Sequence, residues 1–269
     1  MINPYFEGAV LGTIQGITEW LPVSSKGMII LARKTFFNHE VGLTEDLRIA
    51  LFLHIGTFLA ALWYLRKEVF TIGKTALNYK KETIQNKKLF QFVFITTLTS
   101  GLVGLAIYST MQGFENHFLV RKELVMGLIG FFLLITSFLE FTKRFTGERS
   151  VENIEVKDGF WLGLVQGLAA FPGLSRSGST VALLLLRHFK PEAALKLSFL
   201  VSLPIILLGN VLLNYERILH PDWSLMFGLL FSFGFGLATI HSLTLLARRI
   251  HFGYFTLFFG ILALVAAFI

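Results

Sequence analysis

Long apolar stretches most constrain what this chain can fold into. A membrane-spanning helix needs about 20 mostly apolar residues, and six stretches reach or approach that length. They lie at residues 48–65, 89–110, 124–142, 192–213, 224–246 and 254–269. Only 15% of the residues are charged, whereas an ordinary soluble domain has about 25%. We therefore expect an all-α polytopic membrane protein whose residues 1–269 form a single membrane domain.

Composition excludes several other classes of protein. The chain has no cysteine, so it forms no disulfide scaffold and no thiolate metal site. With 54% hydrophobic residues it is not a disordered chain. Its net charge of +7 comes from few charges in all, and we interpret the basic excess as a signal of membrane topology. We expect membrane lipids, and no nucleic acid, as partners.

Two further apolar stretches, 5–32 and 159–189, are interrupted near their middles by proline, glycine and serine. The interruptions are at 21–27 and 171–178. Proline and glycine end helices, and serine offers the backbone alternative hydrogen bonds. Each half is about 12–16 residues long, too short to cross a bilayer of ~30 Å. We predict re-entrant helical hairpins, because such broken backbone is tolerated only inside protein or along a wet cavity.

The two interrupted stretches resemble each other, and each is followed by three predicted spans. The shared residues are Gly8, Gly12, Gln15 and Gly16 in the first stretch and Gly159, Gly163, Gln166 and Gly167 in the second. A hairpin adds no crossing and three spans add an odd number, so the second half must be inverted relative to the first. We predict an inverted-topology repeat, with repeat 1 at about 1–142 and repeat 2 at about 159–269.

The distribution of basic residues predicts the orientation of the chain. Sixteen of the 24 lysines and arginines fall in four loops, and six fall in segments on the opposite side. The four loops are 66–88, 143–158, 187–196 and 247–253. Because cytoplasmic loops carry the basic excess, we place these loops inside the cell and both termini outside.

Glu19 and Arg176 are ionisable residues at membrane depth, one in each interrupted stretch. Such residues are costly in a membrane and usually functional. Since they lie on the two hairpins of an inverted repeat, they can meet at one site. The alternative is a buried structural ion pair that braces the hairpins.

Hydroxyl groups and glycines cluster around these two residues. A helix begins after each interruption, and its free N–H groups and dipole favour an anion. Arginine adds a planar fork suited to phosphate oxygens. The pattern predicts a phosphate pocket at two helix N-termini; the alternative is that serine and glycine only satisfy and pack broken helices.

Two motifs carry a resemblance to a known family. They read Gln15-x3-Glu19-Trp-Leu-Pro22-Val-Ser24-Ser25-Lys-Gly27 and Pro172-Gly173-Leu-Ser175-Arg176-Ser177-x2-Thr180. They resemble the signature motifs of the undecaprenyl-diphosphate phosphatase family, the bacitracin-resistance proteins, and the resemblance covers essentially the whole chain. It implies a multi-pass phosphatase of the prokaryotic cytoplasmic membrane that removes the terminal phosphate of a polyprenyl diphosphate at the outer face. This reaction recycles the lipid carrier of the cell envelope.

The resemblance also implies a homodimer, a divalent cation (Mg²⁺ or Ca²⁺) and roles for single residues. Glu19 is expected to bind the metal or act as a base, Ser25 to be the nucleophile and Arg176 to hold the diphosphate. The residues predicted to bind substrate are Gln15, Ser24, Gly27, Ser175, Ser177 and Thr180. A single carboxylate supplies too few ligands for a divalent cation unless substrate phosphates supply further oxygens.

The chain departs from the family pattern at Met28, where the family has a histidine with a catalytic role. Methionine cannot transfer a proton. Either the chemistry uses Ser25 or a water activated by Glu19, or the protein is a non-hydrolytic binder, flippase or transporter of phosphorylated polyprenyl lipid. His54 and His241 lie within predicted spans, and either could replace the missing histidine. We interpret both as hydrogen-bonded structural groups; the alternative is that His54 belongs to the site.

Overall fold

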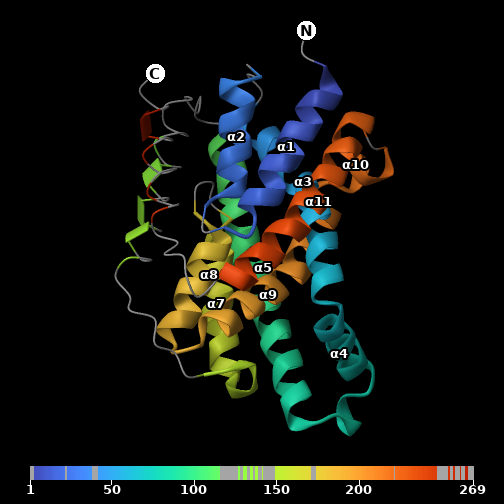
Figure 1. Cartoon of the computed structure of the whole chain (residues 1–269), viewed down its shortest axis with the longest axis vertical. Coiled ribbons are helices and arrows are strands. Elements are labelled where there is room, and N and C mark those ends of the chain that lie inside the picture. The colour runs from blue at the N-terminus through green and yellow to red at the C-terminus, as the bar shows by residue number, and fades with distance from the viewer. Residues whose placement is uncertain are drawn as a thin grey trace.

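A computed structural model describes residues 3–21, 23–37, 42–115, 149–170, 174–220 and 222–246, with scattered positions between 127 and 141 and between 254 and 265. Its long elements are α-helices (Figure 1). Four are long and apolar enough to cross a membrane, as expected of a helical membrane protein. They are α3 (Leu43–Tyr64), α5 (Ile84–Glu115), α9 (Pro191–Leu213) and α11 (Trp223–Leu246).

These helices confirm four of the six predicted spans, namely 48–65, 89–110, 192–213 and 224–246. The predicted spans 124–142 and 254–269 lie largely outside the described residues. Shorter elements connect the long helices. They are α4 (Arg66–Leu77), η1 (Tyr79–Lys81), η2 (Val151–Asn153) and α10 (Tyr215–Leu219).

Each interrupted stretch forms two short helices. The first stretch gives α1 (Pro4–Thr18) and α2 (Ser25–Thr35), and the second gives α7 (Val156–Leu168) and α8 (Arg176–Leu186). At 1.5 Å per residue, α1 is about 22 Å long and α8 about 16 Å, less than the ~30 Å of a bilayer core. The helices end and restart where the sequence predicts.

Close approach of backbones holds the first helix of each interrupted stretch, α1 or α7, in place. Helix α1 packs on α11, and α7 packs on α5. A Cβ atom at Gly12 would overlap the carbonyl group of Gly228, and one at Gly163 would overlap the side chain of Thr99. Glycines on α1 and α7 therefore let each of these helices pack closely against a long helix from the other half of the chain.

The described basic loops gather at one end of the molecule, the end at which Figure 1 shows α4. Lys196 Nζ lies 2.5 Å from Glu68 Oε1, and the backbone of Arg149 hydrogen-bonds with His188 and Lys190. Parts of three predicted cytoplasmic loops thus lie side by side, in agreement with the charge pattern.

Candidate functional site

A cavity of about 350 Å³ lies between the hairpins and three of the long helices. Five basic or acidic side chains from both halves of the chain line the cavity. They are Glu19, Lys26, Arg48, His54 and Arg176. The rest of the wall is mostly leucine, isoleucine and glycine from α3, α5 and α9. The cavity therefore joins a charged pocket to an apolar groove.

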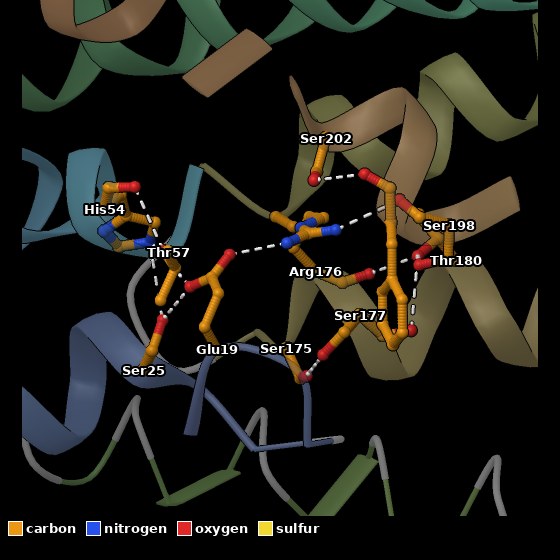
Figure 2. A network of polar contacts seen from close by, with 12 residues as sticks. Glu19, Ser25, His54, Thr57, Ser175, Arg176, Ser177, Thr180, Ser198 and Ser202 are labelled. Atoms are coloured by element: carbon orange, nitrogen blue, oxygen red, sulfur yellow. Dashed lines mark hydrogen bonds and ion pairs between the residues drawn. The ribbon is translucent and has the colours of Figure 1, made fainter. Parts of the chain in front are cut away.

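Glu19 and Arg176 meet at the charged end, as the sequence predicts (Figure 2). Glu19 follows α1 as its C-cap and is buried, and Arg176 begins α8. Arg176 donates from Nη2 to Glu19 Oε1 at 2.5 Å and from Nη1 to the carbonyl oxygen of Ser198 at 3.1 Å. The guanidinium carbon lies 5.7 Å from the centre of the Trp20 ring. These contacts fix the orientation of the Arg176 guanidinium group.

The other carboxylate oxygen of Glu19, Oε2, contacts three polar groups. Ser25 Oγ donates to Oε2 at 2.7 Å and Gln15 Nε2 donates at 2.9 Å. His54 Nε2 lies 2.9 Å from the same oxygen and 3.5 Å from Ser25 Oγ. Figure 2 shows the Glu19 carboxylate between Ser25 and His54 on one side and Arg176 on the other. Gln15, Glu19 and Ser25 are thus brought together as predicted.

His54 is a site residue that the sequence offered only as the less favoured alternative. We interpreted it as a structural group, but it lines the cavity and contacts Glu19. The signal in the sequence was a polar residue inside the apolar stretch 48–65. That signal does not say which way the helix is turned, so it could not place the ring beside Glu19. His241 has a different setting: it is exposed on α11 and lies near Tyr64.

Most of the predicted phosphate-binding hydroxyls are already used within the hairpins. Ser24 and Ser175 cap α2 and α8, and their side chains accept from the backbone N–H groups of Gly27 and Gly178. Neither serine, nor Ser25, is among the residues that line the cavity. These contacts match the alternative interpretation, in which serine satisfies broken helices. Their part in substrate binding stays a prediction.

Two other predicted binding residues connect separate segments. Ser177 Oγ donates to the carbonyl oxygen of Leu21 at 2.6 Å and thereby ties the second hairpin to the first. Thr180 Oγ1 lies 2.7 Å from Ser198 Oγ on α9. Both hydroxyls hold in place the elements that carry Glu19 and Arg176.

The described donors do not by themselves fit a divalent cation. No group of three or more histidine, aspartate or glutamate side chains gathers as a metal site in the described part of the chain. Glu19 is the one carboxylate that lines the cavity, and both of its oxygens already accept from Arg176, Ser25 and Gln15. The buried Gln15 Oε1 has no hydrogen-bond partner, but a single amide oxygen is a weak addition. The expected cation on Glu19 stays a prediction.

Comparison with known proteins places this geometry in a family context. A sequence model described as "Bacitracin resistance protein BacA" matches residues 8–265. A protein of Methanococcoides burtonii named undecaprenyl-diphosphatase is 33% identical over 267 residues, 98% of each chain. Proteins of the same name from Haloarcula marismortui and Alkaliphilus metalliredigens are 35% and 33% identical, and the matches cover 98% and 93% of this chain. The similarity includes both hairpins and the helices that line the cavity.

Proposed function

The chain belongs to the bacitracin resistance protein BacA family, and we propose that it is a membrane phosphatase that hydrolyses an undecaprenyl-type polyprenyl diphosphate to the monophosphate and phosphate. The observation that carries this proposal is the cavity, whose charged end continues into an apolar groove. A diphosphate head group needs charged partners, and a prenyl tail needs an apolar groove. Relatives that cover nearly the whole chain are named undecaprenyl-diphosphatase.

Arg176 and Lys26 supply the positive charge for the diphosphate. Both line the cavity, and the planar guanidinium suits paired phosphate oxygens. Glu19 accepts a hydrogen bond from one Nη of Arg176, so the diphosphate competes with this carboxylate for the guanidinium group. In the reaction Arg176 stabilises the negative charge that develops on the transferred phosphoryl group.

Ser25 is the proposed nucleophile and Glu19 its base. The Ser25 hydroxyl donates to the Glu19 carboxylate at 2.7 Å, the arrangement of a hydroxyl poised to lose its proton. Oγ attacks the terminal phosphorus, polyprenyl monophosphate leaves, and water hydrolyses the phosphoserine. The alternative nucleophile is a water molecule, for which Glu19 is the same base.

We propose the inverted repeat of about 1–142 and 159–269, with re-entrant hairpins, as the architecture that builds this site. Support comes from paired contacts. Helix α1 packs on α11 as α7 packs on α5. In the same way, Arg33 at the end of α2 pairs with Glu7, and Arg187 at the end of α8 pairs with Asp158.

The proposed site faces the outside of the cytoplasmic membrane. The cavity is lined by the beginning of α3 and the end of α9, including Leu47, Arg48, Leu212 and Leu213. This is the end opposite the basic loops, and basic loops mark the cytoplasmic side. The homodimer stays a prediction from the resemblance.

Phosphate release from undecaprenyl diphosphate by the purified protein in detergent tests the function. We expect release by the wild type and none by Glu19→Gln, which keeps the size of the side chain and removes the base. A folded wild-type protein that binds the lipid without releasing phosphate would contradict the proposal and favour a non-hydrolytic flippase or transporter.

A further inference from the structure

The His54 side chain is buried, has a fixed orientation and contacts both Ser25 and Glu19. We propose that His54 is a catalytic residue that, with Glu19, takes up the Ser25 proton and later returns it. The inference rests on the proposed phosphatase function and adds a residue to its machinery. The imidazole comes from α3, outside both signature motifs.

A backbone contact orients the imidazole ring. His54 Nδ1 lies 2.6 Å from the carbonyl oxygen of Ala50, one turn earlier in α3. A carbonyl oxygen only accepts hydrogen bonds, so Nδ1 carries a hydrogen and donates it. The ring is thereby held with Nε2 toward Glu19, and Nε2 is the nitrogen left for proton exchange.

The three reacting atoms form a closed triangle. Ser25 Oγ lies 2.7 Å from Glu19 Oε2, which lies 2.9 Å from His54 Nε2, and Nε2 lies 3.5 Å from Ser25 Oγ. At 2.9 Å a carboxylate oxygen and an imidazole nitrogen share a proton, since two lone pairs at that distance repel each other. Glu19 and His54 therefore act as one proton-holding pair, and a proton can move among the three atoms without rotation of a side chain.

The two steps need a group that takes up one proton and later returns it, and the pair can do both. In the first step Ser25 Oγ bonds to the terminal phosphorus, the bond from phosphorus to the bridging oxygen breaks, and polyprenyl monophosphate leaves with that electron pair. The Ser25 proton passes to the Glu19–His54 pair, which already shares one proton and then holds two, one on the Glu19 carboxyl group and one on His54 Nε2. In the second step a water oxygen bonds to phosphorus, and Oγ leaves with the electron pair of its P–O bond. Oγ takes the proton back from the pair, and both water protons remain on the released phosphate.

Positive side chains already surround the Glu19–His54 pair. A proton carrier at this place should therefore not add another permanent charge. Arg176 Nη2 already pairs with Glu19 Oε1, and Lys26 and Arg48 line the same cavity. A serine oxygen that leaves phosphorus needs a proton from a weak acid, which arginine cannot supply. Histidine gives and takes protons near neutral pH, so it suits both directions of the transfer.

Two substitutions at position 54 test the assignment. His54→Gln keeps an N–H donor that can reach Glu19 but cannot take up a proton. We expect its kcat to fall by about 10²–10⁴, the usual range for loss of a proton-transfer group. We expect binding of a non-hydrolysable methylene-bisphosphonate analogue of the substrate to stay within about threefold of wild type, a change of about 0.65 kcal/mol in binding free energy. Added imidazole should restore at least a tenth of the lost rate to His54→Ala.

His241→Gln is the matched control, because it makes the same change at a second intramembrane histidine that lies outside the cavity. We expect its kcat to equal that of the wild type. A His54→Gln variant with more than a third of the wild-type kcat would overturn the assignment. So would loss of analogue binding by His54→Gln together with no response of His54→Ala to imidazole, which is the pattern of a structural role. An inactive wild type would instead overturn the phosphatase function itself, so the two failures are distinguishable.

Discussion

Glu19 and Arg176 are 157 residues apart in the chain, yet Arg176 Nη2 lies 2.5 Å from Glu19 Oε1. The contact joins the end of α1 to the beginning of α8, and so joins the two hairpins in the wall of the cavity. Ionic contacts buried in a membrane protein are costly and are retained where function needs them. Here the pair shares its cavity with Lys26, Arg48 and His54, more charge than a structural brace requires.

The first prediction concerns the shape of the cation at position 176. Arg176→Lys keeps the charge but loses the fork that reaches both Glu19 and the Ser198 carbonyl. We expect kcat/KM for undecaprenyl diphosphate to fall by about 10²–10³, as on loss of one transition-state donor. Steady-state phosphate release measures this effect. Arg66→Lys, exposed on α4, should change nothing, and an Arg176→Lys enzyme with unchanged kinetics would disprove a directional phosphate contact.

The second prediction separates two neighbouring serines. Ser25 donates to Glu19, whereas Ser24 caps α2. We expect Ser25→Ala to lose phosphate release entirely and to keep wild-type thermal stability within a few degrees. Ser24→Ala should keep the reaction and lose about 1 kcal/mol of stability, the usual cost of a lost N-cap.

Phosphate release and thermal unfolding of both serine variants in one detergent give the comparison. A Ser25→Ala protein that still releases phosphate at the wild-type rate would rule out the serine nucleophile. In that case a water molecule activated by Glu19 would take its place.

The third prediction concerns the apolar groove. Gly104 lines the cavity, and the nearest atoms to a Cβ there would be 4.0 Å away, so a larger side chain enters the groove. We expect Gly104→Leu to raise KM for undecaprenyl diphosphate about tenfold, roughly 1.4 kcal/mol. The KM for a short farnesyl-type diphosphate should change much less. Gly73→Leu, in open space on α4, is the control; equal effects on both substrates would place the prenyl tail elsewhere.

The fourth prediction concerns acid stability at the end that carries the basic loops. Asp158 lies in the first turn of α7 and pairs with Arg149 and Arg187. Burial acts to raise the pKa of Asp158, but hydrogen bonds from Arg149, the Glu155 backbone and Arg187 outweigh burial, and the pKa is lowered. A carboxyl whose pKa is lower in the folded state stabilises the fold at pH values above its unfolded pKa, and this stability is lost as the pH falls through the folded pKa.

We therefore expect Asp158→Asn to unfold at a lower temperature than the wild type at pH 7. The difference should shrink as the pH falls below about 4, the ordinary aspartate range. Thermal unfolding in detergent at several pH values measures it, with the exposed Glu216→Gln as control. A difference that does not depend on pH would show that the charge of Asp158 is not the stabilising feature.

Sequence reasoning predicted the elements of this fold well where the signal is local. Four spans and the interruptions of both broken stretches are where the apolar pattern places them, since helix length and helix ends depend on nearby residues. Glu19 and Arg176 could be singled out because a charge inside an apolar stretch is conspicuous. Spacing alone did not say that Ser24 and Ser175 use their hydroxyls as caps.

The sequence by itself determined a helical membrane protein, the positions of its helices and the chemical identity of the groups available for phosphate chemistry. Only the tertiary structure decided which groups meet. The rotation of α3 about its axis places His54 Nε2 3.5 Å from Ser25 Oγ, and glycine contacts between α1 and α11 set where Glu19 lies. Such contacts join residues far apart in the chain, so no local pattern encodes them; they follow from how the helices pack once the chain has folded.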